Sequence, residues 1–239
     1  MAEQVLTNAL ILFGGYNLSN QLTAVTIDHS AEPQDRTAFS DTTRRRVGGL
    51  LQSILSAQGY FDAPDPDSPL AAALGVSGNI ITVANDSADG SIGYAMQAHV
   101  GEYNPLSGAV GDLAGFSLNA GCSDGGLVRG TLMHNNTRTA SGNGTTRQLG
   151  AISASQRLYA SLHVLAASGS SPTLDIDIVS DDNAGMTSAT TRGSFTQASA
   201  IGSQWVEVAG AVTDDYWRVA YTIGGTSPSF QFVVLLGIL

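Results

Sequence analysis

The sequence contains no lysine and a single cysteine, Cys122, so all ten basic side chains are arginines and no disulfide can form within the chain. Charged residues make up 13% of the 239 residues, about half the roughly 25% of an ordinary soluble domain. Acids outnumber bases 20 to 10, and the net charge of −10 argues against a protein that grips nucleic-acid phosphates. An apolar fraction of 43% argues equally against a disordered chain.

Long apolar runs are also missing, since no stretch approaches the roughly 20 residues that a membrane-spanning helix needs. The N-terminal segment 1–13 has no positive flank, so we expect no signal peptide, and with the lack of disulfides this predicts folding in a reducing cytosol. Enzyme signatures are scarce as well: the chain has no nucleophile elbow, phosphate loop or zinc-binding helix motif. We therefore expect no enzyme activity, no cofactor, no metal and no membrane partner.

What the chain does contain is alternation of apolar and polar residues, which is typical of strands with one buried face. One short helix is predicted after Asp67 or Ser68, with Pro69 in its first turn and Gly75 at its end. The acidic and proline-rich run 62–67 is predicted to be a stiff connector into that helix. The strands that we predict are 22–27, 80–84, 92–103, 114–120, 127–133, 157–165, 173–179, 217–223 and 230–238.

The charge is divided unevenly along the chain, which suggests two units with different surroundings. Residues 1–126 hold 13 acids and 4 bases, whereas residues 127–239 hold 7 acids and 6 bases. A glycine-rich seam at 121–126 separates these two parts. We predict an all-β fold: a first β-sandwich or barrel-like domain at 1–126, and a C-terminal immunoglobulin-like or jelly-roll-like β-sandwich at 127–239.

The segment 35–59 is the hardest part of the first half to interpret. Its beginning is polar and turn-rich, and 51–57 fits either a helix or an alternating strand. Because strand signals flank the segment, we favour a long projecting β-hairpin or loop, and long ordered loops are usually functional. Arg44, Arg45 and Arg46 form its concentrated positive charge. They could bind phosphate, dock on the acidic face of a neighbouring copy, or belong to a solvated loop tip.

Alternation in the second half places Leu158 and Leu162 on one strand face and Ser161 and His163 on the other. Segments 169–174 and 225–230 resemble each other, and we interpret them as two hairpins with similar turn chemistry. We expect Trp217 in the core.

Two groups of side chains in this half could hold a ligand. Trp205 and Tyr216 could offer aromatic platforms to a sugar. Asp175, Asp177 and Asp181, followed by Asp182 and Asn183, form a candidate calcium site, with a solvated strand face and an Asx-type turn as the alternative.

The spacing of turn residues and aromatics over about 10–126 resembles the opening of phage tail tube (major tail) proteins. The segments that carry this resemblance are 13–19, Leu22, 35–44, 49–50, 59–62, the short helix near Pro69, and 110–117. Residues 127–239 depart from the minimal family pattern and look like an added sandwich. The resemblance contains no catalytic signature.

The resemblance implies a structural virion protein that forms rings of six, stacked into a tail tube through which DNA passes without specific binding. It implies assembly in the host cytoplasm beside other phage tail proteins. The long loop would contact the next ring through Arg44, Arg45, Arg46, Asp35 and Asp41, and acids of the first half would line the bore. The alternative is a capsid decoration or carbohydrate-binding adhesin module; a glycoside hydrolase with paired acids is least favoured.

Overall fold

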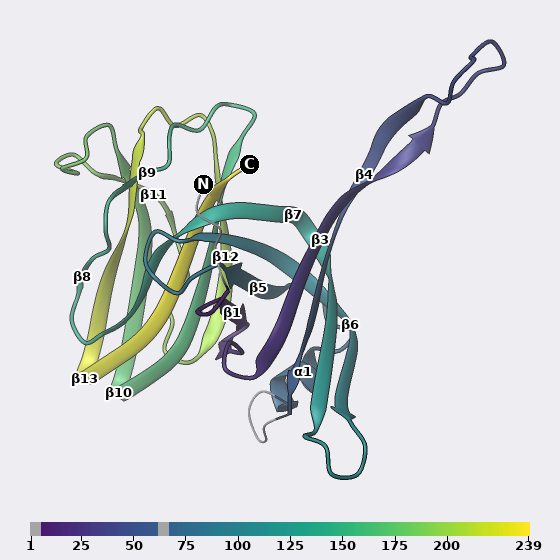
Figure 1. Cartoon of the computed structure of the whole chain (residues 1–239). Coiled ribbons are helices and arrows are strands. Elements are labelled where there is room, and N and C mark those ends of the chain that lie inside the picture. The colour runs from purple at the N-terminus through teal and green to yellow at the C-terminus, as the bar shows by residue number, and fades with distance from the viewer. Residues whose placement is uncertain (1–5, 62–66) are drawn as a thin grey trace. The chain divides into compact units, whose positions relative to one another are not determined.

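The computed structural model describes residues 6–61 and 67–239, and this part of the chain is all-β with one short helix, α1 (Asp67–Ala73) (Figure 1). The fold class predicted from the sequence is therefore confirmed. The strands are β1 (Leu10–Phe13), β2 (Tyr16–Asn17), β3 (Leu22–Asp35), β4 (Arg46–Tyr60), β5 (Asn79–Ala84), β6 (Ile92–Ser107), β7 (Gly115–Arg138), β8 (Gly142–Asn143), β9 (Arg147–Gln148), β10 (Arg157–Asp181), β11 (Thr190–Ser194), β12 (Gly202–Ala209) and β13 (Tyr216–Ile238).

The chain divides into two compact units, each built from separate segments. Unit 1 comprises residues 1–20, 79–95 and 128–239, and unit 2 comprises residues 21–78 and 96–127. Strands β1 and β5 pair with each other, and their apolar side chains join a cluster with Val233 and Leu235 of β13. The N-terminal segment therefore groups with the C-terminal one, whereas the sequence placed it in a domain of residues 1–126. Whether 1–126 and 127–239 act as separate functional domains stays a prediction.

Unit 1 is a two-layer sandwich in which β10 and β13 belong to both layers. The first half of β10 pairs with β12 and with the end of β13, and its second half pairs with β11 and with the beginning of β13. Apolar residues of all four half-strands form one core, among them Leu162, Ile176, Val219 and Phe232. Trp217 is fully buried in this core, as predicted, and its indole N–H donates to the carbonyl of Gly150 at 2.9 Å.

The two similar segments 169–174 and 225–230 are not two hairpins, so that interpretation of the sequence was wrong. They are facing bends in β10 and β13, which stay paired on both sides of the corner. Gly169 and Gly225 have φ of 113° and 111°. A Cβ on Gly169 would lie 2.8 Å from the carbonyl oxygen of Ser227, and one on Gly225 would lie 2.7 Å from that of Ser171. Each bend therefore packs against the other, and both positions need glycine.

The outer face of β10 is also covered in unit 1, which the alternation did not predict. His163 is fully buried, and its Nδ1 lies 2.6 Å from the carbonyl of Gly14 while Nε2 lies 2.8 Å from the hydroxyl of Thr82. The Thr82 hydroxyl in turn lies 3.0 Å from that of Ser161. An Nδ1–H tautomer that donates to Gly14 satisfies the ring, and burial lowers the pKa of His163 to about 4.

Unit 2 is an antiparallel sheet with one apolar face and one polar face. Strand β4 pairs with β3 on one side and, over 54–60, with β7 on the other. Leu55 and Phe116 on the apolar face are buried, and α1 contributes the buried Leu70 and Ala73. Helix α1 begins and ends as the sequence predicts, with Gly75 just beyond its end at φ 76°. The predicted connector 62–67, apart from Asp67, lies outside the described residues.

The segment 35–59 forms the turn and most of the second strand of a long hairpin, so the hairpin interpretation is confirmed. The pairing runs from Leu22↔Gly59 to Asp35↔Arg46. The alternation predicted only 22–27 as a strand, because 28–35 is polar on both faces. Among the residues that the structure describes, no helix is long and apolar enough to cross a membrane.

Candidate assembly surfaces

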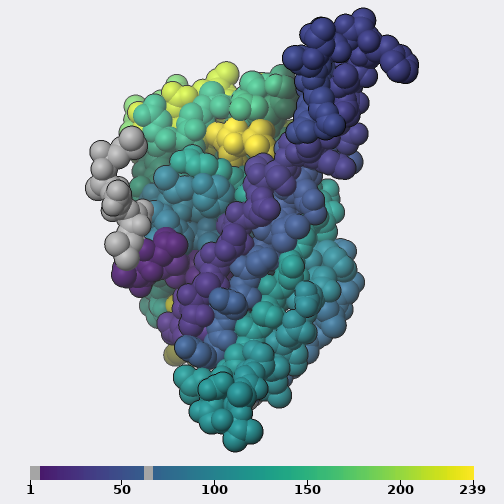
Figure 2. Space-filling view, turned by 45° about the vertical axis from the view of Figure 1, so that its right-hand side comes forward, coloured from purple at the N-terminus to yellow at the C-terminus, as the bar shows by residue number. Residues whose placement is uncertain are grey.

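The outer part of the β3–β4 hairpin projects from unit 2 without a third strand. Pairing of β4 with β7 stops at Ile54↔Gly121, whereas pairing with β3 continues to Arg46. We call residues 30–52 the arm. All of them are exposed except Asp41 and Gly49, which are half-buried. Figure 2 shows the arm in purple and blue at the upper right. Eight residues of β4 beyond Ile54 span about 26 Å at the rise of a strand. A two-stranded hairpin is marginally stable alone, so we expect a partner surface.

The tip of the arm, residues 35–46, has a defined structure. Asp35 accepts the N–H of Thr37 at 2.8 Å, and hydrogen bonds from the hydroxyl and N–H of Thr37 lower the pKa of Asp35. Asp41 accepts the N–H of Ala38 at 2.9 Å and forms an ion pair with Arg45 at 3.0 Å. Asp35 and Asp41 therefore brace the tip itself, and a contact of either with another subunit stays a prediction.

Positive charge in unit 2 is confined to this tip. Arg36, Arg44, Arg45 and Arg46 give the tip a net charge of +2, whereas the rest of unit 2 has eight acids and no base. Arg36, Arg44 and Arg46 form no ion pair with the residues that the structure describes. Such separation of charge favours contact between the tip of one copy and the body of another.

The face of the sheet opposite α1 is polar and carries no arginine. A shallow hollow there is lined by residues of four strands, β3, β4, β6 and β7, among them Thr26, Ser56, Gln58 and Ser117. Asn104 donates to Glu102 at 2.8 Å and to the hydroxyl of Ser117 at 3.2 Å. The lining of this hollow presents hydroxyl and amide groups and the carboxylate of Glu102, with no basic group that would attract a polyanion.

Exposed large apolar side chains gather in unit 2. Ten of the fifteen found among the described residues belong to it. The ten are Phe39, Val47, Leu50, Leu51, Tyr60, Leu74, Val76, Leu106, Val110 and Leu113. Concentration of exposed apolar residues marks an interaction surface. The sequence analysis did not predict that these residues are exposed; Phe39, Leu50, Tyr60, Val110 and Leu113 entered it only within segments that carry the family resemblance.

The two residues named as sugar platforms lie on different layers of unit 1. Trp205 on β12 pairs with Ser161 in the first half of β10, whereas Tyr216 on β13 pairs with Asp181 at the end of its second half. Trp205 is half-buried against the β1–β5 cluster, with its ring centroid 5.9 Å from that of Tyr159. The structure therefore does not bring the two rings together, and a sugar site at either stays a prediction.

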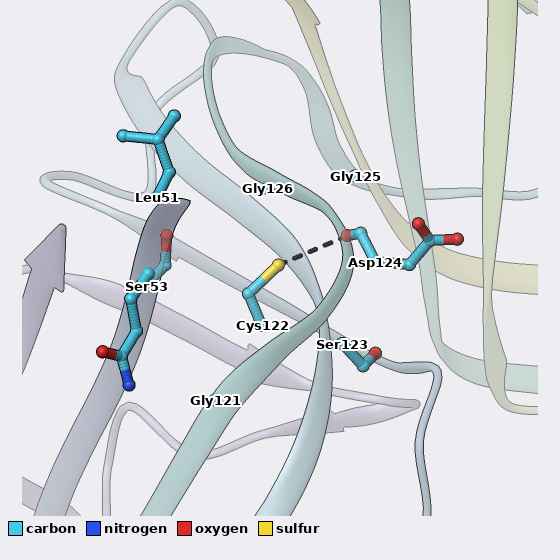
Figure 3. Close-up of a pocket in the computed structure, with 9 residues that line it drawn as sticks. Leu51, Ser53, Gly121, Cys122, Ser123, Asp124, Gly125 and Gly126 are labelled. Atoms are coloured by element: carbon cyan, nitrogen blue, oxygen red, sulfur yellow. Dashed lines mark hydrogen bonds between the residues drawn. The ribbon is translucent and has the colours of Figure 1, made fainter. Parts of the chain in front are cut away.

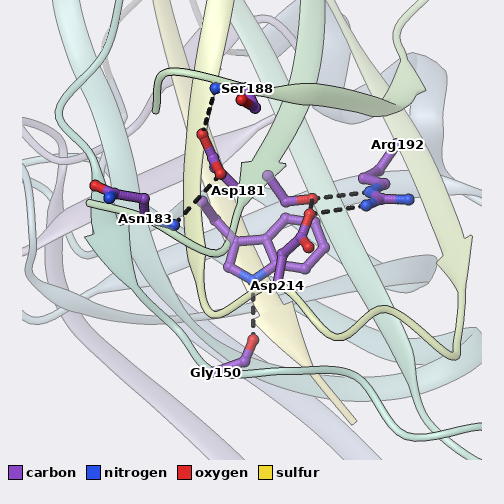
Figure 4. Close-up of polar contacts among 8 residues, drawn as sticks. Gly150, Asp181, Asn183, Ser188, Arg192 and Asp214 are labelled. Atoms are coloured by element: carbon purple, nitrogen blue, oxygen red, sulfur yellow. Dashed lines mark hydrogen bonds and ion pairs between the residues drawn. The ribbon is translucent and has the colours of Figure 1, made fainter. Parts of the chain in front are cut away.

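The carboxylates of the candidate calcium site already have other partners. Gln197 donates to Asp175 at 3.0 Å, and Ser194 donates to Asp177 at 2.5 Å. Asp181 accepts the N–H of Ser188 at 2.8 Å (Figure 4). No group of three or more His, Cys, Asp or Glu among the described residues could hold a metal ion. Asp181 is the cap of the loop that follows it, which agrees with the Asx-type alternative.

A further carboxylate, that of Asp214, contacts the buried Ser180 and the half-buried Arg192 (Figure 4). Ser180 donates to it at 2.6 Å and the Arg192 guanidinium lies 2.7 Å away, so both lower the pKa of Asp214. Beside them, a hydrogen bond with Asp181 and its negative charge raise the pKa of Asp182. These groups tie β10 to the segment before β13.

No family model matches the sequence, and no curated protein is similar to it. Several solved structures overlap with it loosely. A chain of the virion of a native gene transfer agent particle has 19% identity and a TM-score of 0.42, covering 52% of this chain and 97% of that one. A chain of the sheath–tube complex of an extracellular contractile injection system (PVC) has 10% identity and a TM-score of 0.42, covering 53% and 90%.

A third structure overlaps over the whole chain. It is the Dit (gp 19.1) protein of SPP1, described as a hub of the adsorption apparatus of phages that infect Gram-positive bacteria. The identity is 12% and the TM-score 0.37, with 97% of this chain and 99% of that chain covered. At these identities and TM-scores the overlaps assign no family, and the proposals below rest on the surfaces of the chain itself.

Proposed function

We propose that the chain is a structural, non-enzymatic subunit of a phage-type tail, which self-assembles into rings that stack into a tube for DNA. The observation that carries this proposal is the arm: an ordered, exposed hairpin without a third strand, which bears all the positive charge of unit 2 at its tip. In the tube, the arm of each subunit contacts the adjacent ring. The subunit belongs to the virion after assembly in the host cytoplasm.

Ring closure would use the open edges of the unit 2 sheet. Among the described strands, β3 pairs with β4 alone, so the other edge of this 14-residue strand presents the unpaired N–H and C=O groups of alternate residues. Long open edges invite pairing with another chain, and a closed ring leaves no edge free. Six copies is the number that the sequence resemblance implies.

The polar face without arginine supplies the bore in this proposal. Hydroxyl, amide and carboxylate groups do not hold phosphates, and DNA binding needs neutralisation of phosphates by bases. Glu102 is the acid that lines the hollow on this face. DNA would then pass through the tube without being bound.

The test is electron microscopy of the purified chain and two arm variants. In Arg44→Glu/Arg45→Glu/Arg46→Glu the tip becomes acidic and repels an acidic body, so we expect rings without stacks. The matched variant Arg44→Lys/Arg45→Lys/Arg46→Lys keeps the charge, and we expect it to stack like the parent. Stacks of the glutamate variant would refute the role of the arm, and a parent protein that stays monomeric at high concentration would refute the proposed function.

A further inference from the structure

The apolar face of the unit 2 sheet continues onto the root of the arm, where no described residue of the unit covers it. Leu51 on β4 shares a face with the buried Leu55 and Ala57, because side chains alternate along a strand. Leu51 is 69% exposed. A bulge between Leu51 and Gly48 reverses the alternation further out, so Val47 belongs to the other face. The face that is buried in the body of the sheet is therefore uncovered at the root of the arm.

A hollow of about 290 Å³ lies at this root, where β4 and β7 diverge (Figure 3). Leu51, Gln52 and Ser53 line it from β4, and the segment 121–126, which includes Asp124, lines it from β7. The thiol of Cys122 lies in the hollow and donates to the carbonyl of Asp124 at 3.3 Å. Cys122 shares a strand face with the buried Ala120 and Leu118, so the hollow opens on the apolar side of the sheet.

The opposite end of the same sheet presents a convex apolar turn, the loop 108–114 between β6 and β7. Asp112 braces this loop, since its carboxylate accepts the N–H of Ala109 at 3.1 Å and its own N–H donates to the Ala109 carbonyl at 3.1 Å. Val110 stands between these two residues and is fully exposed, and Leu113 is 72% exposed. A braced turn that holds an apolar side chain in water is preorganised for binding.

The register places the hollow and the loop so that two parallel copies can meet. Tyr60 pairs with Gly115 beside the loop, whereas Ile54 pairs with Gly121 beside the hollow. The loop and the arm therefore lie at opposite ends of the sheet, and moving a second copy along the strand direction brings its loop to the first copy's hollow. Such a contact joins two different patches, so it repeats without closing and builds a stack.

The charges agree with this placement. With the loop seated at the root, the arm runs about 26 Å further along the second copy. Its tip, with a net charge of +2, then lies against unit 2 of the second copy. Outside its own tip, that unit carries acidic residues and no basic one. Apolar contact at the root and electrostatic contact at the tip would act together.

We infer that the hollow between Leu51 and Cys122 is the docking site for the loop 108–114 of a second copy of this chain, with Val110 as the inserted side chain. This inference rests on the proposed stacking and names the surface that receives the next subunit. Burial of a valine side chain stabilises by about 1.5–3 kcal/mol, so Val110→Asp should raise the concentration for half-maximal stacking roughly tenfold or more. Ile201→Asp, at an exposed position of unit 1, is the matched control and should leave that concentration unchanged.

Cross-linking to the native cysteine tests the contact directly. In Val110→Cys, oxidation with diamide should link each loop to Cys122 of the next copy and give a ladder of multimers on a non-reducing gel. Val110→Cys/Cys122→Ser should give dimers at most, and Ile201→Cys should give no ladder. Electron microscopy of the same samples separates the two proposals: stacks of Val110→Cys without a ladder overturn the docking site and leave the tube intact, whereas absence of stacks in the parent overturns both.

Discussion

Shortening the arm should abolish stacking while leaving the fold of the subunit nearly unchanged. The variant replaces residues 36–45 with Asn-Gly, so that Asp35 and Arg46, which already pair, are joined by a two-residue hairpin turn. Closing a loop of two residues instead of ten favours the folded state by about 1.4 kcal/mol. Against this, the variant loses the exposed hydrogen bonds of the tip, including those of Thr37 and Ala38.

These two effects have opposite signs and similar size, so we expect a net change within about 1–2 kcal/mol and a shift of the melting midpoint below about 5 °C. Circular dichroism gives the midpoint at concentrations where parent and variant are both monomeric, because assembly alone would raise it. Sedimentation velocity then measures stacking at higher concentration. A variant that stacks like its parent, or that melts far below it, would refute the reasoning that the tip contacts only other subunits.

Two further predictions concern unit 1. Burial lowers the pKa of His163 to about 4 from an ordinary 6.5, so the unfolded chain binds the extra proton and the free energy of unfolding falls as pH drops from about 6.5 toward 4. In His163→Gln, the loss of unfolding free energy between about pH 6.5 and pH 4 should be smaller by about 3 kcal/mol than in the parent. Urea titrations at a series of pH values measure this difference, and an equal loss in both proteins would contradict a buried neutral ring. Gly169→Ala and Gly225→Ala should each destabilise by about 1–3 kcal/mol, since a Cβ meets backbone at φ above 100°. Ser170→Ala is the exposed control, and equal melting of all three variants would show that the corner tolerates a side chain.

Strands could be predicted from the sequence where apolar and polar residues alternate. They were missed where a segment is a strand only because it pairs with another segment. Residues 22–27 alternate enough to be recognised, whereas 28–35 is polar on both faces and is a strand only because 46–54 pairs with it. The corner shows the same limit. Gly169 and Pro172 indicate a turn, but nothing local tells a hairpin from a bend whose partner lies more than fifty residues away.

Of the candidate assembly surfaces, only part could be predicted from the sequence. The arginine triplet and the hairpin were visible as patterns, so the tip was found. The hollow was not found, and residues 110–117 were noted only for the family resemblance, because an exposed valine in a glycine-rich turn has no distinctive sequence pattern. His163 was placed only on the strand face opposite Leu158 and Leu162, since the strand's own sequence does not show that Gly14 and Thr82 cover that face.

The folded-over pair of β10 and β13 has a mechanical consequence. In a sandwich held together by side chains alone, the layers can slide or part once their apolar contacts yield. Here each layer continues into the other through two covalent backbones that remain hydrogen-bonded on both sides of the corner. Prying the layers apart at that edge would therefore require rupture of the ladder itself, and unit 1 is built to resist shear there.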